Sequence, residues 1–156
     1  GQSINHVLET KAVHGRLARG ENSIGKARVV RGGNDATIVT WGAMVHVALE
    51  AAKEASKKGI EAEIIDLRTI MPFDAQTCID SVRRTGRLVV LQEAQYTGGF
   101  GHTINSRILE EAFWNLEATP VVIGALDTPV PFSPPLEDYT IPTAELVLRH
   151  LQRMCE

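Results

Sequence analysis

The alternation of short apolar runs with longer amphipathic segments constrains the fold of this chain more than any other feature of its sequence. The apolar runs are rich in β-branched residues and predict strands, at residues 27–31, 36–41, 61–67, 88–91 and 120–123. The amphipathic segments predict helices, at residues 43–58, 75–84 and 102–116 and after Thr143. Strands and helices that alternate in this way form right-handed βαβ crossovers. We therefore expect an α/β fold with a mainly parallel sheet and helices on both of its faces.

The first two strands are expected to break the parallel pattern, because only the short turn at residues 32–35 joins them. A parallel pair needs a crossover of about a dozen or more residues, which this turn does not provide. One edge strand of the sheet is therefore predicted to be antiparallel.

Several side chains are predicted to end the helices or to line their buried faces. Asp74 and Thr143 are expected N-caps, and Gly59 and Gly86 are expected at the ends of helices. The first helix is expected to bury Val45, Ala48, Leu49, Ala52 and Ala55. The helix after residue 101 is expected to bury Ile104, Ile108, Leu109, Ala112, Phe113 and Leu116. The proline-rich segment at residues 127–135 is predicted to lack regular structure.

The most distinctive local segment is RLVVLQEAQYTGGFG, residues 87–101, in which an apolar strand runs into a glycine turn at residues 97–101. Open α/β sheets usually bind ligands at such strand ends. As a dinucleotide fingerprint the turn lacks its third glycine, because position 104 is Ile104, and it has no Gly-Lys-Ser/Thr ending for a phosphate loop. The other reading is that the glycines allow a tight reversal and a close approach of the following helix.

Few other residues offer chemistry. His102 lies near Glu93 in sequence, and these two residues are either an acid/base pair or a surface carboxylate and an ordinary helix-terminal histidine. Asp66 and Arg68 follow another strand, where they fit either a ligand edge or an ion pair that holds loops. The five histidines lack the spacing of a zinc site, and no nucleophile motif is present. The residues therefore predict a domain without a complete active site of its own.

Charge and hydropathy limit the partners and the location. The net charge is −3 and no basic stripe is present, so a nucleic-acid partner is not expected. No apolar run reaches the roughly 18 residues of a membrane span. The two cysteines, Cys78 and Cys155, form no CxxC pair, which favours a reduced intracellular setting. We expect the cytoplasm, or the mitochondrial matrix in a eukaryote. Residues 1–24 show no sustained periodicity and are interpreted as a linker or the tail of a preceding domain.

Five segments in order, ATIVTWGAMVHVALEAA, IEAEIIDLRTIMPFD, RLVVLQEAQYTGGFG, EEAFWNLEATPV and DTPVPF, resemble one family. They are similar to the C-terminal transketolase-like domain of the beta subunit in thiamine-diphosphate-dependent 2-oxo acid dehydrogenases. The resemblance implies a three-layer α/β/α domain over residues 25–156 with a five-stranded mixed sheet. It also implies that residues 1–24 leave a preceding pyrimidine-binding domain.

The same resemblance implies an enzyme that oxidatively decarboxylates a 2-oxo acid and passes the acyl group to a lipoyl acyltransferase. Its thiamine diphosphate and magnesium are held by other domains, through a GDG…N motif and an activating glutamate that this chain lacks. No catalytic, cofactor-binding or metal-binding residue can therefore be assigned here, and the fragment alone is expected to be inactive. The implied partners are an alpha subunit or domain, a second beta subunit and the lipoyl acyltransferase core.

What the resemblance assigns to this domain is an assembly surface near the glycine turn. The interface candidates are Glu93, Thr97, Gly98, Gly99, Phe100, Gly101 and His102. The segment EEAFWNLEATP resembles branched-chain members, which favours 3-methyl-2-oxobutanoate as substrate, with pyruvate and acetoin as alternatives. Two other hypotheses stay open. They are the C-terminal domain of a transketolase or deoxyxylulose-phosphate synthase, and a stand-alone nucleotide-binding or regulatory module.

Overall fold

The computed structural model describes residues 24–156, so the predicted linker lies outside the described residues except for its last position. Five strands form one sheet: β1 (Arg28–Arg31), β2 (Ala36–Thr40), β3 (Ala62–Asp66), β4 (Leu88–Gln95) and β5 (Val121–Ala125). The helices are α2 (Met44–Ser56), α3 (Ala75–Thr85), α4 (Phe100–Ala112), α5 (Pro134–Thr140) and α6 (Ala144–Cys155). A 3₁₀ turn, η1 (Phe113–Asn115), follows α4 directly.

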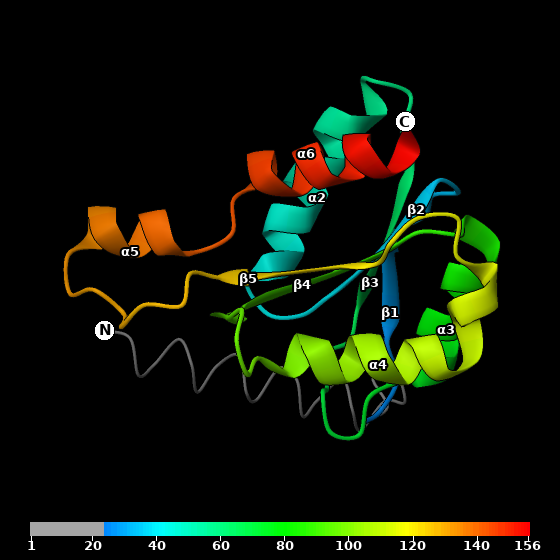
Figure 1. Ribbon diagram of the computed structural model, residues 1–156, viewed down its shortest axis with the longest axis horizontal. Helices are drawn as coiled ribbons and strands as arrows, with labels where there is room; N and C mark the ends of the chain where they lie inside the picture. Colours follow the sequence, from blue (N-terminus) through cyan, green and yellow to red (C-terminus); the bar gives the residue numbers. More distant parts are fainter. Residues whose placement is uncertain (1–23) are drawn as a thin grey trace, which may run out of the picture.

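The strand order is β1-β3-β2-β4-β5, and every neighbouring pair is parallel except β1 with β3. The predicted mixed sheet with one antiparallel edge strand is therefore confirmed. The short turn before β2 does not build a hairpin, because β1 pairs with β3 instead of with β2 (Figure 1). The ends of β2 to β5 define a carboxyl edge, where α5 lies, and an amino edge at the opposite side.

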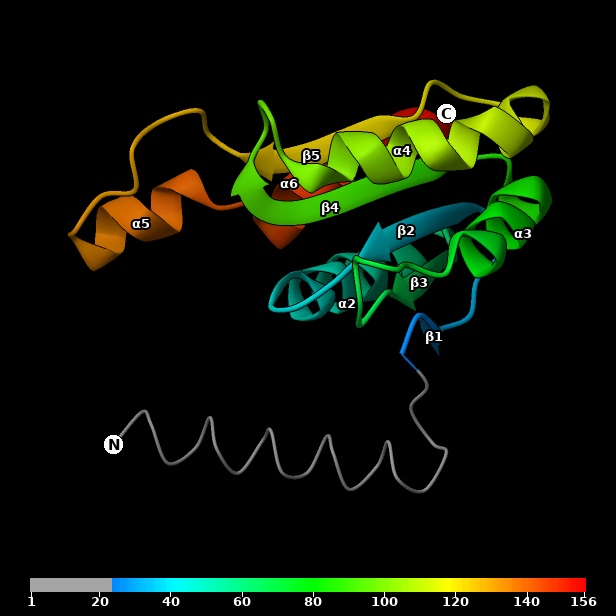
Figure 2. The ribbon, with the colours of Figure 1, turned by 90° about the horizontal axis from the view of Figure 1, so that it is seen from below.

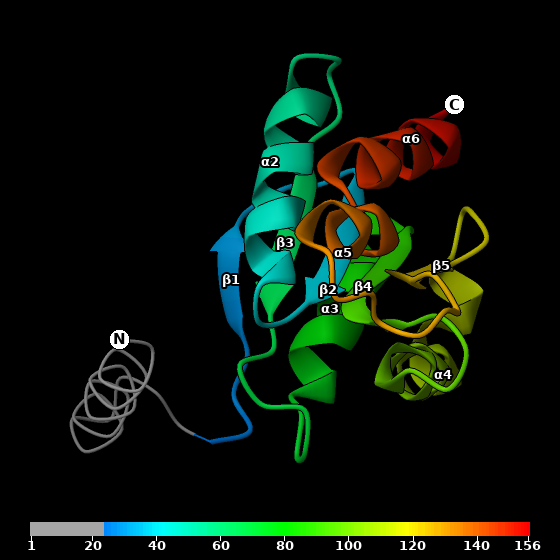
Figure 3. The same ribbon diagram turned by 90° about the vertical axis from the view of Figure 1, so that its left-hand side faces the viewer.

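The sheet lies between two helical layers, with α2 and α6 on one face and α3 and α4 on the other (Figure 3). Successive side chains on a strand point to opposite faces, and neighbouring residues of β2 accordingly enter different cores. Ile38 packs into the α2/α6 core and Val39 into the α3/α4 core, both fully buried. Each fully buried aliphatic side chain of this size stabilises the fold by about 1.5–3 kcal/mol. The predicted three-layer architecture is confirmed.

Three of the four predicted helix caps are confirmed; the exception is Gly59, because α2 ends at Ser56 and its C-cap is Lys57. The Asp74 carboxylate accepts a hydrogen bond from the Thr77 amide, and the Thr143 hydroxyl accepts one from the Leu146 amide. Gly86 follows α3 with a φ of 68°, a left-handed conformation that favours glycine.

Three details differ from the sequence expectations. In α2, Met44 and Ala51 are buried while Val45 and Leu49 are only partly buried, so its buried face is rotated. Phe113 is 55% exposed, because α4 ends at Ala112 and the chain tightens into η1. The predicted loop at residues 127–135 runs into α5. Prolines fit the first turn of a helix, where no amide proton is needed.

Candidate functional site at the carboxyl edge

The glycine turn projects from the carboxyl edge, between the end of β4 and the start of α4 (Figure 2). Strand β4 is longer than predicted and continues past Leu91 to Gln95, with its last three residues exposed. Among the predicted interface residues, Glu93, Thr97 and Gly98 are exposed, Gly99, Phe100 and His102 are half-buried, and Gly101 is buried. The structure therefore brings the predicted residues together, but only part of the set reaches the surface.

A glutamine that the sequence analysis did not select lies beneath this turn. Gln92 is fully buried. Its side-chain Nε2 donates to the Gln95 carbonyl at 2.9 Å, and its Oε1 accepts from the Gly101 amide at 2.6 Å. Because a carbonyl only accepts and an amide only donates, the two backbone partners fix the orientation of the side chain.

The glycines of the turn serve two different purposes. Gly98 has a φ of +76°, which disfavours other residues there. A Cβ atom on Gly99 would lie 1.8 Å from Gln92 Nε2, and one on Gly101 would lie 2.7 Å from Gln92 Oε1. The prediction of a tight reversal with a close approach of the helix is confirmed at these positions.

A carboxylate from the next loop fastens the outer side of the turn. Asp127 accepts hydrogen bonds from the Thr97 amide at 2.8 Å and from the Thr97 hydroxyl at 2.7 Å. These two bonds lower the pKa of Asp127 below its ordinary value, and the amide makes the larger contribution. The Tyr96 amide also donates to the Ala125 carbonyl at the end of β5. The turn is thus held from the strand below and from the loop beside it.

His102 is bound to the turn and not to Glu93. Its Nε2 lies 2.8 Å from the Tyr96 carbonyl oxygen, so this nitrogen carries the proton. The two rings meet edge to face with their centroids 4.7 Å apart. Because the described contacts of the ring are with Tyr96, the geometry does not support the acid/base pair with Glu93.

The second predicted charged pair holds loops. Asp66 accepts a hydrogen bond from the Arg68 amide, and the Arg68 guanidinium donates to the Lys26 carbonyl at 2.7 Å. These bonds connect the loop after β3 with the segment that enters β1. Asp66 and Arg68 therefore stabilise these two segments against each other within the described residues.

A hollow of about 200 Å³ opens beside the turn, under α5. It is lined by Glu93, Ala94, Gln95, Ala125, Leu126, Thr128, Val130, Glu137, Thr140 and Ile141. Large apolar side chains on and before α5 are exposed, namely Val130, Phe132, Leu136 and Tyr139. Exposed apolar groups gathered in one region indicate a surface for another protein.

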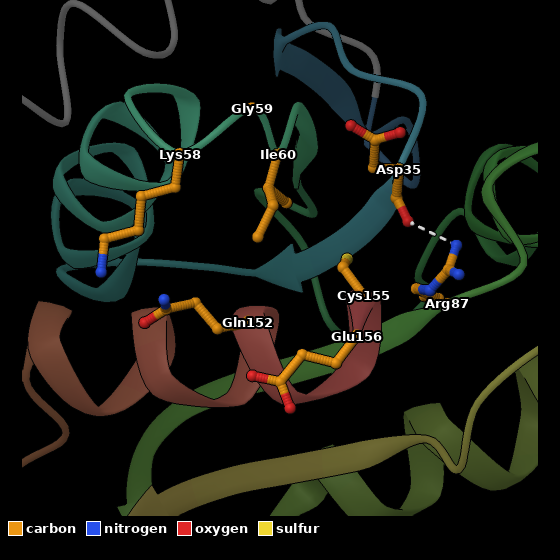
Figure 4. A pocket seen from close by; sticks show the side chains of 8 residues that line it. All are labelled: Asp35, Lys58, Gly59, Ile60, Arg87, Gln152, Cys155 and Glu156. Atoms are coloured by element: carbon orange, nitrogen blue, oxygen red, sulfur yellow. Dashed lines mark hydrogen bonds between the residues drawn. The ribbon is translucent and has the colours of Figure 1, made fainter.

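A second hollow, of about 350 Å³, lies at the amino edge (Figure 4). It is lined by Asp35, Lys58, Gly59, Ile60, Arg87, Gln152, Cys155 and Glu156. Arg87 binds the Asp35 and Met154 carbonyls there, and burial raises the pKa of the Cys155 thiol. Open parallel sheets bind ligands at the other edge, so this hollow is the weaker candidate.

The described residues do not fit thiamine diphosphate with magnesium. Within residues 24–156, no three histidine, cysteine or acidic side chains gather as metal ligands would. The Gly101 amide, which a diphosphate at the start of α4 would need, is occupied by Gln92.

The helices among residues 24–156 include no candidate for a membrane span, judged by their length and hydropathy.

Comparison with known proteins gives a consistent result. The family described as transketolase, C-terminal domain, matches residues 25–147. The chain is 47% identical over 134 residues to the acetoin:2,6-dichlorophenolindophenol oxidoreductase subunit beta of Cupriavidus necator, covering 85% of this chain and 40% of that protein. It is 44% identical over 133 residues to the pyruvate dehydrogenase E1 component subunit beta of Bacillus subtilis, covering 85% of this chain and 41% of that one.

Two further similarities extend this result. The mitochondrial 2-oxoisovalerate dehydrogenase subunit beta of Dictyostelium discoideum is 46% identical over 112 residues, covering 71% of this chain and 30% of that protein. Among solved structures, the inactive beta4 tetramer of a split-gene transketolase superposes with a TM-score of 0.68 at 30% identity. That superposition covers 86% of this chain and 42% of the other. The chain thus spans less than half the length of these relatives.

Proposed function

The chain belongs to the transketolase C-terminal domain family, and from this premise we propose that it is the C-terminal domain of a 2-oxo acid dehydrogenase beta subunit. The observation that carries the proposal is the 47% identity to a beta subunit across 85% of the chain. The parent enzyme would be an oxidoreductase that oxidatively cleaves its substrate, releasing carbon dioxide from a 2-oxo acid or acetaldehyde from acetoin, and passes the acyl group to a lipoyl acyltransferase.

The domain's own contribution in this proposal is assembly. Its described residues form no site that fits the cofactor, so thiamine diphosphate and magnesium would be held by other domains. The carboxyl edge supports an assembly role through a turn held by buried hydrogen bonds and apolar side chains exposed around α5. The proposed partners are an alpha subunit, a second beta subunit and the acyltransferase core.

The substrate is proposed at the level of a class. The relatives named for acetoin, pyruvate and 2-oxoisovalerate have similar identities to the chain, 47%, 44% and 46%. The branched-chain preference suggested by EEAFWNLEATP is therefore one arm of the test. Pyruvate and acetoin are the other two.

The test uses the full-length protein that contains this chain, co-expressed with its alpha subunit. Reduction of dichlorophenolindophenol is measured with 3-methyl-2-oxobutanoate, pyruvate and acetoin, with and without thiamine diphosphate and magnesium. We expect a stable complex and cofactor-dependent activity with one of the three substrates. Ketol transfer between sugar phosphates, without activity on these substrates, would instead establish the transketolase alternative.

A further inference from the structure

We propose that Gln92 is a positioning residue, whose buried side-chain amide sets the conformation of the glycine turn and thereby the docking of the alpha subunit. The proposal rests on the assembly role proposed above. It concerns a residue that does not reach the surface, since Gln92 is fully buried beneath the turn.

The first observation is an irregularity of the sheet at this position. Leu91 pairs with Ile123 and Gln95 pairs with Ala125, so β4 has two more residues than β5 between the same pairs. Such a bulge leaves backbone groups out of the ladder. The Gln92 side chain spans the bulge and satisfies the Gln95 carbonyl at its far end.

The second observation is the other end of the same side chain. The first amides of a helix have no carbonyl of a preceding turn to bind. Gly101 lies in the first turn of α4 and is buried, and its amide donates to Gln92 Oε1. One glutamine therefore joins the last residue of β4 to the first turn of α4. Its primary amide offers a donor and an acceptor at once, as both bonds require.

The third observation is the space that the turn leaves for this amide. A Cβ atom on Gly99 or on Gly101 would overlap the Gln92 side chain, at 1.8 Å and 2.7 Å. Gln92 and these two glycines are thus complementary in shape as well as in hydrogen bonding.

These contacts reach the surface through adjacent residues. Gln95 immediately precedes Tyr96, and Gly101 immediately precedes His102. Because Gln92 holds the Gln95 carbonyl and the Gly101 amide, it fixes the backbone from which the Tyr96 and His102 side chains extend. The rings in turn meet edge to face, and His102 donates to the Tyr96 carbonyl. The exposed Tyr96 ring and the half-buried His102 ring are therefore placed by a side chain that does not itself reach the surface.

The test is Gln92→Glu in the full-length protein, with assembly and amide exchange measured at about pH 8 and about pH 5. At high pH the carboxylate can accept from Gly101 but cannot donate to the Gln95 carbonyl. When protonated it can do both, and burial with a bond to the neutral form raises its pKa above the ordinary value of about 4.3. Loss of one buried bond corresponds to about a tenfold weakening of the alpha-subunit complex at high pH. We expect recovery at low pH.

The wild-type protein is measured in the same pH series, because other ionisable side chains lie near the turn. They are Glu93 and Tyr96 on the β4 side, His102 on α4 and Asp127 after β5, and none bonds to the Gln92 amide in the described structure. Gln152→Glu on α6 is the matched control, since it makes the same charge change away from the turn and should assemble like the wild type.

The outcomes distinguish a failure of the positioning role of Gln92 from a failure of the proposed function. Normal assembly of the variant at high pH would overturn the positioning role, whatever the exchange of the Gly101 amide, because the carboxylate still accepts the bond from that amide. If the wild-type protein forms no complex with an alpha subunit, the proposed function fails. The positioning role is overturned with it, because no docking would remain for Gln92 to control. A folding defect is recognised by a lowered urea denaturation midpoint at high pH, because protonation at low pH would relieve a buried carboxylate in the fold and in the turn alike.

Discussion

The two edges of the sheet differ in how their polar groups are satisfied. At the amino edge, polar side chains pair within the chain: Thr37 bonds Ser81 and Thr85, and Arg84 pairs with Glu63 at 2.7 Å. At the carboxyl edge, the glycine turn is bonded within the chain as well, but the hollow under α5 is not closed in this way. Glu93 and Glu137 border it and have no hydrogen bond or ion pair from their carboxylates among the described residues.

The difference teaches which edge stabilises the domain and which is available to a partner. A buried polar group costs free energy unless it is bonded, so a completed network marks a region shaped by folding. Unpaired carboxylates beside exposed apolar side chains cost folding nothing and suit a surface that another chain completes. Exposed aromatic rings alone do not separate the edges, because Trp114, near the amino edge, is 94% exposed.

The largest expected effect is at the amino edge, for Gly33→Ala. Its Cβ atom would lie 2.3–2.5 Å from backbone atoms of Glu61, Ala62 and Glu63, which begin β3 and cannot move without breaking the sheet. We expect a loss of about 3 kcal/mol in the free energy of unfolding, measured by urea denaturation. The control is Gly32→Ala, where nothing lies within 4 Å. Equal stability of the two variants would contradict a close-packed amino edge.

The next effect compares the two ends of β2 with one substitution. Thr37→Val should cost about 2 kcal/mol, because it removes the hydroxyl shared by the buried Ser81 and Thr85. Thr40→Val, towards the carboxyl edge, removes a single bond to the Leu91 carbonyl and should cost about 1 kcal/mol. Denaturation midpoints of both variants give the comparison, and the reverse order would count against it.

The smallest effect on global stability is expected from Asp127→Ala at the carboxyl edge, which removes both acceptors of the Thr97 bonds. The folded-state pKa of Asp127 is lowered, so its bonds to Thr97 contribute fully above the ordinary pKa of about 3.9. They are lost as the pH falls from that value through the lower folded pKa. Protection of the Thr97 amide against exchange, relative to its intrinsic rate at the same pH, should fall in the variant and in the wild type at low pH, while the urea midpoint stays unchanged. Glu93→Gln nearby should change neither measurement.

Much of the fold could be predicted because its signals are local. The β-branched run of β2 and the caps Asp74 and Thr143 act through neighbours in sequence, and they predicted the architecture and two helix starts. Phe113 was assigned to the buried face because the periodicity continues past Ala112. Only the packing of η1 shows that the helix has ended.

The position of the candidate site, at the glycine turn after β4, could be predicted from the sequence. The side chains that hold the turn in its conformation could not. The apolar run predicts a strand that ends at Leu91, before the polar residues Gln92 and Glu93. Strand β4 continues because Gln95 pairs with Ala125, some 30 positions along the chain. That distant pairing makes the bulge. Gln92 faces the α3/α4 layer by the same alternation as Leu88 and Val90, and the bulged segment places the Gln95 carbonyl within reach of its side chain. The link from Thr97 to Asp127 depends on the same long-range arrangement.

The segment that carries α5 leaves and rejoins the domain at one point. The Leu126 amide donates to the Thr140 carbonyl at 3.0 Å, so the two ends of the excursion are bonded to each other. An excursion closed at its base can change in length or composition at little cost to the rest of a domain. The apolar side chains around α5 can therefore change together in evolution, as one segment. A lineage can change its choice of partner there while the sheet and its cores are inherited unaltered.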